Sequence, residues 1–277
     1  MVRLEVDDGS PWWLSPDLWT VPGSDPLGPP GVPIAGSPCY IWARVHNRGD
    51  SSVTNAQVRY YWANPSVAFN RTTATTVGSA YVSLAGGQTT EVLCLTPWVP
   101  TFVNGGHECI LAEAFHPTLD PLPAVPDFQV PTDRHVGQRN ISVLQASPSG
   151  FFAFSFEAHN PGRRPALVFI AVEQLPAAKF GEHLKLLGLP FEVGDGELVG
   201  LGFTQRADVG EKVEPDFPER FELELGAGER RGLTLFGTLK GDAAAVHVTQ
   251  ASGERNLGGL TALVVAGEID KRREAAS

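Results

Sequence analysis

Apolar and polar residues alternate along most of the chain, which is the pattern of β-strands with one buried face. Residues 39–46, CYIWARVH, place an apolar side chain at every second position, and an Asn-Arg-Gly turn follows. Similar runs occur in VRYYWA, SAYVSL, TEVLCL, ECILAEAF and RHVGQRNISVL, separated by Gly- and Pro-containing turns. About seven short strands in this arrangement predict an immunoglobulin-like β-sandwich over residues 1–145.

The second half repeats the order of the first. GFFAFSFEAHNPG parallels YIWARVHNRG, so His46-Asn47 and His159-Asn160 each follow a strand and are expected to fix its turn. FELELGAGERRGLTLFG parallels the strand–turn–strand around Gly86-Gly87, and a final hairpin turns near Gly253. We therefore predict a second β-sandwich over residues 146–267, and an all-β chain of two tandem immunoglobulin-like sandwiches.

One insertion, residues 176–219, interrupts the second repeat. Phe180, Leu184 and Leu187 recur at helical spacing before Gly188, which predicts a short helix. The polar stretch after it is expected to contain a hairpin in ELVGLGFTQ. Residues 268–277, mostly charged or small, are predicted to be a disordered tail.

Charge and hydropathy exclude several classes of partner. The net charge of −10 disfavours nucleic acid and anionic membrane surfaces as partners. No apolar run reaches the ~18–20 residues that a bilayer span needs. The first residues, MVRLEVDDGS, do not resemble a signal peptide, so we expect a cytoplasmic protein, with export by a non-classical route as the alternative.

Two features of the first half have alternative interpretations. Cys39, Cys94 and Cys109 are expected to be small buried hydrophobes, although Cys39 and Cys109 could pair between sheets. Glu113 points outward if Ile110, Ala112 and Ala114 form the core face. If it points inward it needs a cationic partner, such as Arg134 or Arg139.

Several segments together resemble a known family. SPDLW, YIWARVHNRG, VRYYWA, LAGGQTTEV and RHVGQRNISV occur in the order and spacing of the CARDB-type immunoglobulin-like domain of bacteria, over residues 15–144. The resemblance implies a seven-stranded sandwich that serves in adhesion or as an accessory module beside larger domains. It also implies that the domain carries no catalytic residues.

The segment PWWLSPDLWTVPG, residues 11–23, contains three tryptophans ahead of the first long strand. Trp12, Trp13 and Trp19 could plug the sandwich and cover an edge strand that would otherwise invite pairing. Alternatively, they could form an exposed aromatic platform for a sugar or a protein. Because neighbours in an extended chain face opposite sides, Trp12 and Trp13 cannot both point inward.

Candidate polar chemistry gathers in one loop, FHPTLDPLPAVPDFQVPTDRH. An Asp- and His-rich loop at a sandwich end could bind a divalent cation or a sugar, whereas its prolines favour a stiff solvated spacer. Asp7-Asp8 with Asp17 is a weaker calcium candidate. No zinc, P-loop or nucleophile-elbow motif occurs, so we predict no metal, no cofactor and no enzymatic activity. The loop candidates are His116, Asp120, Asp127, Asp133 and His135.

These observations favour a non-enzymatic, protein-binding structural or scaffold module of a bacterial assembly. A protein partner or self-association is expected, because the chain has low charge density and surplus aromatic residues. The alternative is a carbohydrate- or cell-surface-binding accessory module that works beside a hydrolase.

Overall fold

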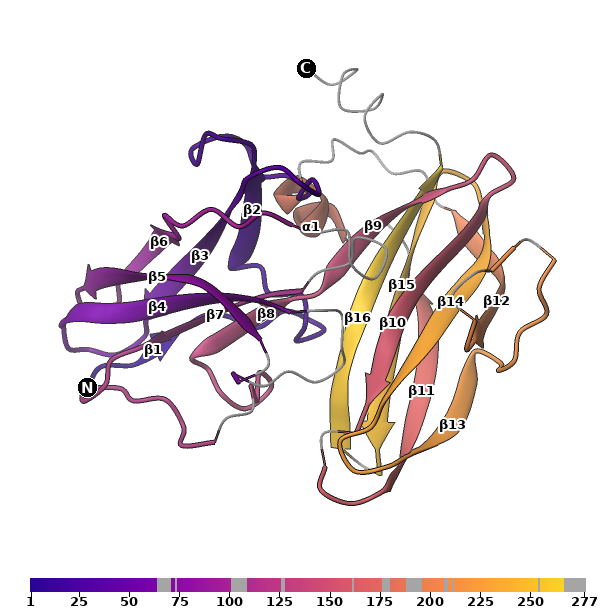
Figure 1. Ribbon diagram of the computed structural model, residues 1–277. Helices are drawn as coiled ribbons and strands as arrows, with labels where there is room; N and C mark the ends of the chain where they lie inside the picture. The colour runs from indigo at the N-terminus through magenta and orange to yellow at the C-terminus, as the bar shows by residue number, and fades with distance from the viewer. Residues whose placement is uncertain are drawn as a thin grey trace. The chain divides into compact units, whose positions relative to one another are not determined.

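The computed structural model describes residues 1–63, 71–72, 74–100, 109–125, 128–160, 162–175, 180–187, 196–206, 209–210, 212–253 and 255–266 (Figure 1). The chain is all-β apart from one short helix in this part. It divides into two compact units, the first made mainly of residues 1–140 and the second mainly of residues from 141 onward. None of the described residues belongs to a helix with the length and apolar character that a bilayer crossing requires.

Two antiparallel sheets form the first unit. In the β3 sheet, strand β3 (Cys39–Asn47) pairs with β1 (Leu4–Glu5), β2 (Leu18–Pro22) and β6 (Thr89–Leu93). The β4 sheet has the order β5 (Thr75–Leu84), β4 (Val53–Ala63), β7 (Cys109–Phe115) and β8 (Val136–Arg139). The main core of the unit includes Leu18, Ile41, Val58 and Ala112, all fully buried. Apolar residues of both sheets thus form one core, as in a β-sandwich.

A second, smaller core lies on the other side of β7. Cys109 and Leu111 pack there with Phe128, Val130 and Val136, while Ile110, Ala112 and Ala114 belong to the main core. Every residue of β7 is therefore buried, including Glu113. Because Cys39 belongs to the main core and Cys109 to the smaller one, the open question of their pairing is resolved: all three cysteines are buried free thiols.

The second unit also has two sheets. One has the order β10 (Phe151–His159), β14 (Arg230–Lys240), β12 (Glu197–Thr204). The other has the order β13 (Arg220–Leu225), β11 (Ala166–Leu175), β15 (Ala243–Ser252), β16 (Arg255–Ala266), β9 (Ile141–Ala146). Phenylalanine and aliphatic side chains from both sheets form one buried cluster. The predicted helix is confirmed as α1 (Gly181–Leu186), with Phe180, Leu184 and Leu187 buried.

A hydrogen-bonded corner ends β3 in the first unit. The side-chain oxygen of Asn47 accepts the Gly49 N–H at 3.1 Å, and its amide nitrogen donates to the Ala85 carbonyl at 3.0 Å. The Gln88 side chain accepts the Ala85 N–H at 2.8 Å. Gly87, with φ of 72°, donates to the Asn47 carbonyl, in a conformation that favours glycine.

The second unit builds the same corner after β10. Asn160 accepts the Gly162 N–H at 2.9 Å and donates to the Gly226 carbonyl at 2.8 Å. Glu229 accepts the Gly226 N–H at 2.6 Å, and Gly228 has φ of 68°. The two corners therefore share their hydrogen bonding, and the asparagine, rather than the preceding histidine, makes the turn.

The predicted strand RHVGQRNISVL is two strands. β8 ends at Arg139 and pairs with β7, whereas β9 begins at Ile141 and runs parallel to β16 in the second unit. Asn140, which separates them, is buried, and its N–H donates to the Trp13 carbonyl at 2.9 Å. The division between the units therefore lies at residues 140–141 rather than at residue 145. The alternating pattern continues across this junction, so it gave no sign of the change of sheet.

The insertion contains no hairpin in ELVGLGFTQ. This segment is the single strand β12, which pairs with β14 and has an irregularity between Val199 and Gly202. Gly200 has φ of 64° at that point, and a bulge of this kind explains the glycines that suggested a turn. The hairpin predicted near Gly253 is confirmed by the pairing of β15 with β16. The predicted tail, 268–277, lies outside the described residues.

Candidate functional site

The outer face of the β3 sheet carries aromatic and charged side chains. Alternate residues of β3 point into the core, so Trp42, Arg44 and His46 lie on the opposite face. Cross-strand register places Trp19 of β2 beside Trp42, and Glu91 of β6 beside Arg44. Strand pairing thus brings together residues from three parts of the chain.

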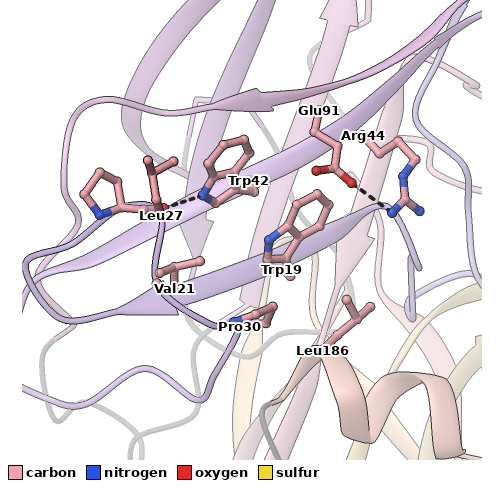
Figure 2. Close-up of a pocket in the computed structure, with 10 residues that line it drawn as sticks. Trp19, Val21, Leu27, Pro30, Trp42, Arg44, Glu91 and Leu186 are labelled. Atoms are coloured by element: carbon pink, nitrogen blue, oxygen red, sulfur yellow. Dashed lines mark hydrogen bonds and ion pairs between the residues drawn. The ribbon is translucent and has the colours of Figure 1, made fainter.

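Trp19 and Trp42 form a stacked pair. Their ring centroids are 5.9 Å apart and the planes differ by 8°. The Arg44 guanidinium lies 5.7 Å from the Trp19 ring, which adds a cation–π contact. The Trp42 Nε1–H donates to the Pro26 carbonyl at 3.0 Å (Figure 2). We call this pair the tryptophan platform.

A pocket opens beside the tryptophan platform (Figure 2). One side is the proline-rich loop after β2, which contributes Pro26, Leu27 and Pro30. The other side ends in an ion pair, in which Arg44 Nη2 lies 3.2 Å from Glu91 Oε1. The pocket therefore combines aromatic and aliphatic walls with a charged end, which is the usual composition of a ligand site.

Arg44 also links the pocket to a group of buried polar residues. Its Nη1 lies 3.3 Å from Asp17 Oδ1, and Asp17 Oδ2 lies 2.8 Å from His46 Nε2. Asp7 Oδ2 is 3.6 Å from the same ring nitrogen and 2.7 Å from Arg48 Nη2. Asp7, Asp17 and His46 could supply three ligand atoms to a cation. However, an arginine already pairs with each carboxylate, Arg44 with Asp17 and Arg48 with Asp7.

The Asp- and His-rich loop is turned inward. His135 Nδ1 lies 2.6 Å from Asp133 Oδ1, and His135 Nε2 lies 3.2 Å from Asp120 Oδ1. Asp120 also pairs with Arg134 and accepts the Leu4 N–H at 2.6 Å. Asp120, Asp133 and His135 are all buried, so they attach the loop to the sandwich rather than face solvent. The expectation of a solvated spacer is wrong for these three residues, because each is paired inside the unit.

The two remaining loop candidates differ from these. His116 is half-buried, and its Nδ1 accepts the Leu119 N–H at 3.0 Å, which closes a local turn. Asp127 lies outside the described residues. His116 is not among the residues that line the pocket of the tryptophan platform.

Glu113 faces the smaller core and is fully buried, so it has internal partners. Its Oε2 lies 2.7 Å from Arg71 Nε, and its Oε1 accepts the Tyr61 O–H at 2.6 Å. Burial, together with the Glu113 carboxylate, raises the pKa of Tyr61. The cationic partners are therefore Arg71, from a distant segment, and Arg59, which lies opposite Glu113 on β4 with its Nη1 3.7 Å from Oε1, rather than Arg134 or Arg139. Arg139 instead donates to the Leu18 carbonyl, and burial lowers its pKa to about 10.

The three tryptophans of residues 11–23 have different positions. Trp13 is buried and contacts Trp12 edge-to-face at 5.5 Å, while Trp12 is half-buried. The Ser15 N–H donates to the Gln138 carbonyl, so this segment covers the edge of β8, which agrees with the first of the two alternatives for these tryptophans. Trp19 belongs to β2 and lines the pocket. Sequence reasoning missed Trp42, Arg44 and Glu91, although the polar face of the alternating run 39–46 contained the signal for the first two.

Exposed apolar side chains gather on two neighbouring loops of the first unit. Leu27 and Ile34 lie on the loop after β2, and their side chains are 77% and 52% exposed. Leu95 and Val99 lie on the loop after β6, and are 78% and 49% exposed. The loops are adjacent, because the Gly36 N–H donates to the Pro100 carbonyl at 2.8 Å. We call these four residues the apolar loop patch.

Comparisons with known proteins leave the family open. No family model matches the chain, and no curated protein matches it. The N-terminal domain of PorA is 16% identical, with a TM-score of 0.26, over 46% of this chain and 86% of that one. CBD12 from CALX1.2 is 13% identical, with a TM-score of 0.20, over 82% of this chain and 93% of that one. Red sea bream transglutaminase is 10% identical, with a TM-score of 0.24, over 91% of this chain and 31% of that one.

Proposed function

We propose that this chain is a non-enzymatic module that binds a protein partner through the apolar loop patch of its first unit. The carrying observation is the exposure of four large apolar side chains on two adjacent loops. Water-exposed apolar groups in one place favour association, because contact with a partner removes them from water. Leu27 also lines the pocket, so the patch continues into the tryptophan platform.

The titratable clusters of the first unit support binding rather than catalysis. Asp17 is paired with Arg44 and His46, and Asp7 is paired with Arg48. The loop carboxylates Asp120 and Asp133 are likewise buried against cationic partners. A scaffold role in a bacterial assembly agrees with the resemblance of residues 15–144 to a CARDB-type domain, and that assignment is part of the proposal.

The test introduces negative charge at exposed leucines of the patch. Leu27→Asp with Leu95→Asp places two carboxylates where a partner would bury leucines, and Leu167→Asp is the matched control on the second unit, 54% exposed. Sedimentation of the wild-type protein measures self-association, and affinity capture from the source cells measures hetero-association. A stoichiometric complex that the patch variant loses and the control keeps is expected. A complex that both variants keep would contradict the assignment of the surface.

A saccharide is the second candidate, and the pocket itself favours it. Sugar rings stack on indole faces, and their hydroxyl groups bond to paired charges such as Arg44 and Glu91. In this case the module would hold carbohydrate or cell-surface polymer beside a hydrolase. Retention on insoluble polysaccharide that Trp42→Ala abolishes and Trp12→Ala does not would favour it over the protein partner.

A further inference from the structure

The tryptophan platform already holds a proline-rich segment of the chain itself. Residues 26–33, PLGPPGVP, contain four prolines, which fix their own φ and bias the preceding residue toward extended backbone. The Trp42 Nε1–H donates to the Pro26 carbonyl at 3.0 Å. Farther along, the Gly31 N–H donates to the Thr20 carbonyl at 2.9 Å, and Thr20 Oγ1 donates to the Gly31 carbonyl at 2.6 Å. The segment is thus seated on β2 and on Trp42.

This contact uses the chemistry by which proteins recognise polyproline II helices. Such a helix has no internal hydrogen bonds, so its carbonyls remain free to accept. Aromatic grooves bind it with little loss of entropy, because its conformation is set before binding. An indole supplies both an apolar face for a proline ring and an N–H for a carbonyl.

Trp19 has the same chemical groups as Trp42 but is only 7% exposed, so a partner reaches it through the pocket that it lines. Its ring lies parallel to that of Trp42, and Figure 2 shows both indole nitrogens on the side of Val21 and Leu27. Among the described residues, the Trp19 Nε1–H makes no hydrogen bond, whereas that of Trp42 donates to the Pro26 carbonyl. The pocket is bounded by Trp19 and Pro30, so a proline ring there would contact apolar walls on both sides.

We propose that Trp19 docks a proline-rich, extended peptide of a partner protein, packed alongside the resident segment 26–33. One carbonyl of the peptide accepts the Trp19 Nε1–H, and one proline ring fills the space between Trp19 and Pro30. The peptide then continues over exposed Leu27 into the apolar loop patch. This inference rests on the proposed function, for which it names the class of partner.

The direct test is a titration with a ten-residue polyproline peptide, followed by tryptophan fluorescence and calorimetry. A glycine–serine peptide of equal length is the flexible control. We expect saturable binding of polyproline only. Trp19→Phe keeps an aromatic face but removes the N–H, and should weaken binding about threefold to tenfold, the effect of one neutral hydrogen bond. Trp12→Phe, the control outside the pocket, should leave the affinity unchanged, and circular dichroism confirms that both variants fold.

Three results would overturn the inference. The first is that polyproline shows no saturable binding. The second is that Trp12→Phe and Trp19→Phe weaken the binding of polyproline equally. The third is that a soluble oligosaccharide such as cellohexaose binds, and that only Trp19→Phe weakens its binding. The proposed function is tested separately by Leu27→Asp with Leu95→Asp. If a captured protein depends on those leucines but is neither displaced by polyproline nor sensitive to Trp19→Phe, the peptide site is refuted and the patch stands. If polyproline binds as expected but no protein complex depends on the leucines, the patch is refuted instead.

Discussion

The buried ion pair between Glu113 and Arg71 allows a quantitative test of the first unit. Glu113→Gln is nearly isosteric and keeps an oxygen for the Tyr61 O–H, so it removes mainly the charge that faces Arg71 at 2.7 Å and Arg59 at 3.7 Å. Glu113 is fully buried and the Arg71 side chain is 14% exposed. Loss of one member of a buried pair costs about 3–5 kcal/mol of unfolding free energy. Arg71 keeps Asp133 and the Val125 carbonyl, so we expect about 2–3 kcal/mol.

Intrinsic fluorescence can isolate this effect. All six tryptophans lie between residues 12 and 98, so urea denaturation followed by tryptophan emission reports the first unit without the second. This matters because a chain of two units does not have to unfold in one step. The expected result for Glu113→Gln is a lower urea midpoint with the same slope.

Glu91→Gln is the matched control on the same unit. Glu91 also faces an arginine, at 3.2 Å from Arg44, but its side chain is 51% exposed. Exposed pairs contribute about 0.2–1 kcal/mol, so the control should be several times less destabilised than Glu113→Gln. Equal losses in the two variants would refute the argument from burial. In a double-mutant cycle, Glu113→Gln should cost much less stability in an Arg71→Met background than in the wild type, because the charge that it leaves unpaired is then already absent.

Three further predictions follow from buried groups. Burial and the carboxylates of Asp7 and Glu5 raise the pKa of Asp8 to about 7. The folded state therefore holds a proton that the unfolded state releases, and the first unit should lose stability as pH rises from about 4 to about 7. Urea midpoints measured across that range should fall for the wild type, and Asp8→Asn should remove this decrease. Burial and the charge of His183 lower the pKa of His247 to about 4, so the unfolded state binds the proton first as pH falls. The second unit should lose stability between about pH 6.5 and pH 4. In thermal melts, the melting temperature of His247→Gln should depend less on pH over that range than the melting temperature of the wild type. The thiols of Cys39, Cys94 and Cys109 should be unreactive to a thiol reagent in the folded chain, and all three should react in denaturant without prior reduction. A Cys39–Cys109 disulfide would leave only one reactive thiol in denaturant.

Local patterns predicted much of the architecture because they act through local physics. An alternating run such as residues 39–46 has one apolar face, and that face must be buried whatever the partner strand is. The hydrogen bond within each Asn-x-Gly turn joins residues only two positions apart, so both corners could be predicted from the sequence. The short helix at Phe180 and the hairpin at Gly253 were predictable for the same reason.

Burial on both faces of a strand could not be read in this way. The alternation of side chains along β7 predicted that Ile110, Ala112 and Ala114 face the core. It did not explain why Cys109 and Leu111, which are apolar, lie on the opposite face with Glu113. They are buried by Phe128 and Val130 from a loop that the sequence suggests is solvated. Likewise, Arg71 reaches Glu113 from 42 positions away, and no local rule selects it over Arg134 or Arg139.

By itself, the sequence determined the all-β class, the two Asn-x-Gly corners and most strand positions, since alternation and turn chemistry need only near neighbours. Tertiary structure decided where one unit ends, which carboxylates are buried, and which tryptophan lines a pocket. The candidate site depends on the register of β2, β3 and β6, which sets Trp19 beside Trp42 and Glu91 beside Arg44. A shift of one residue in that register would turn these side chains into the core, and only the packing of both sheets prevents it.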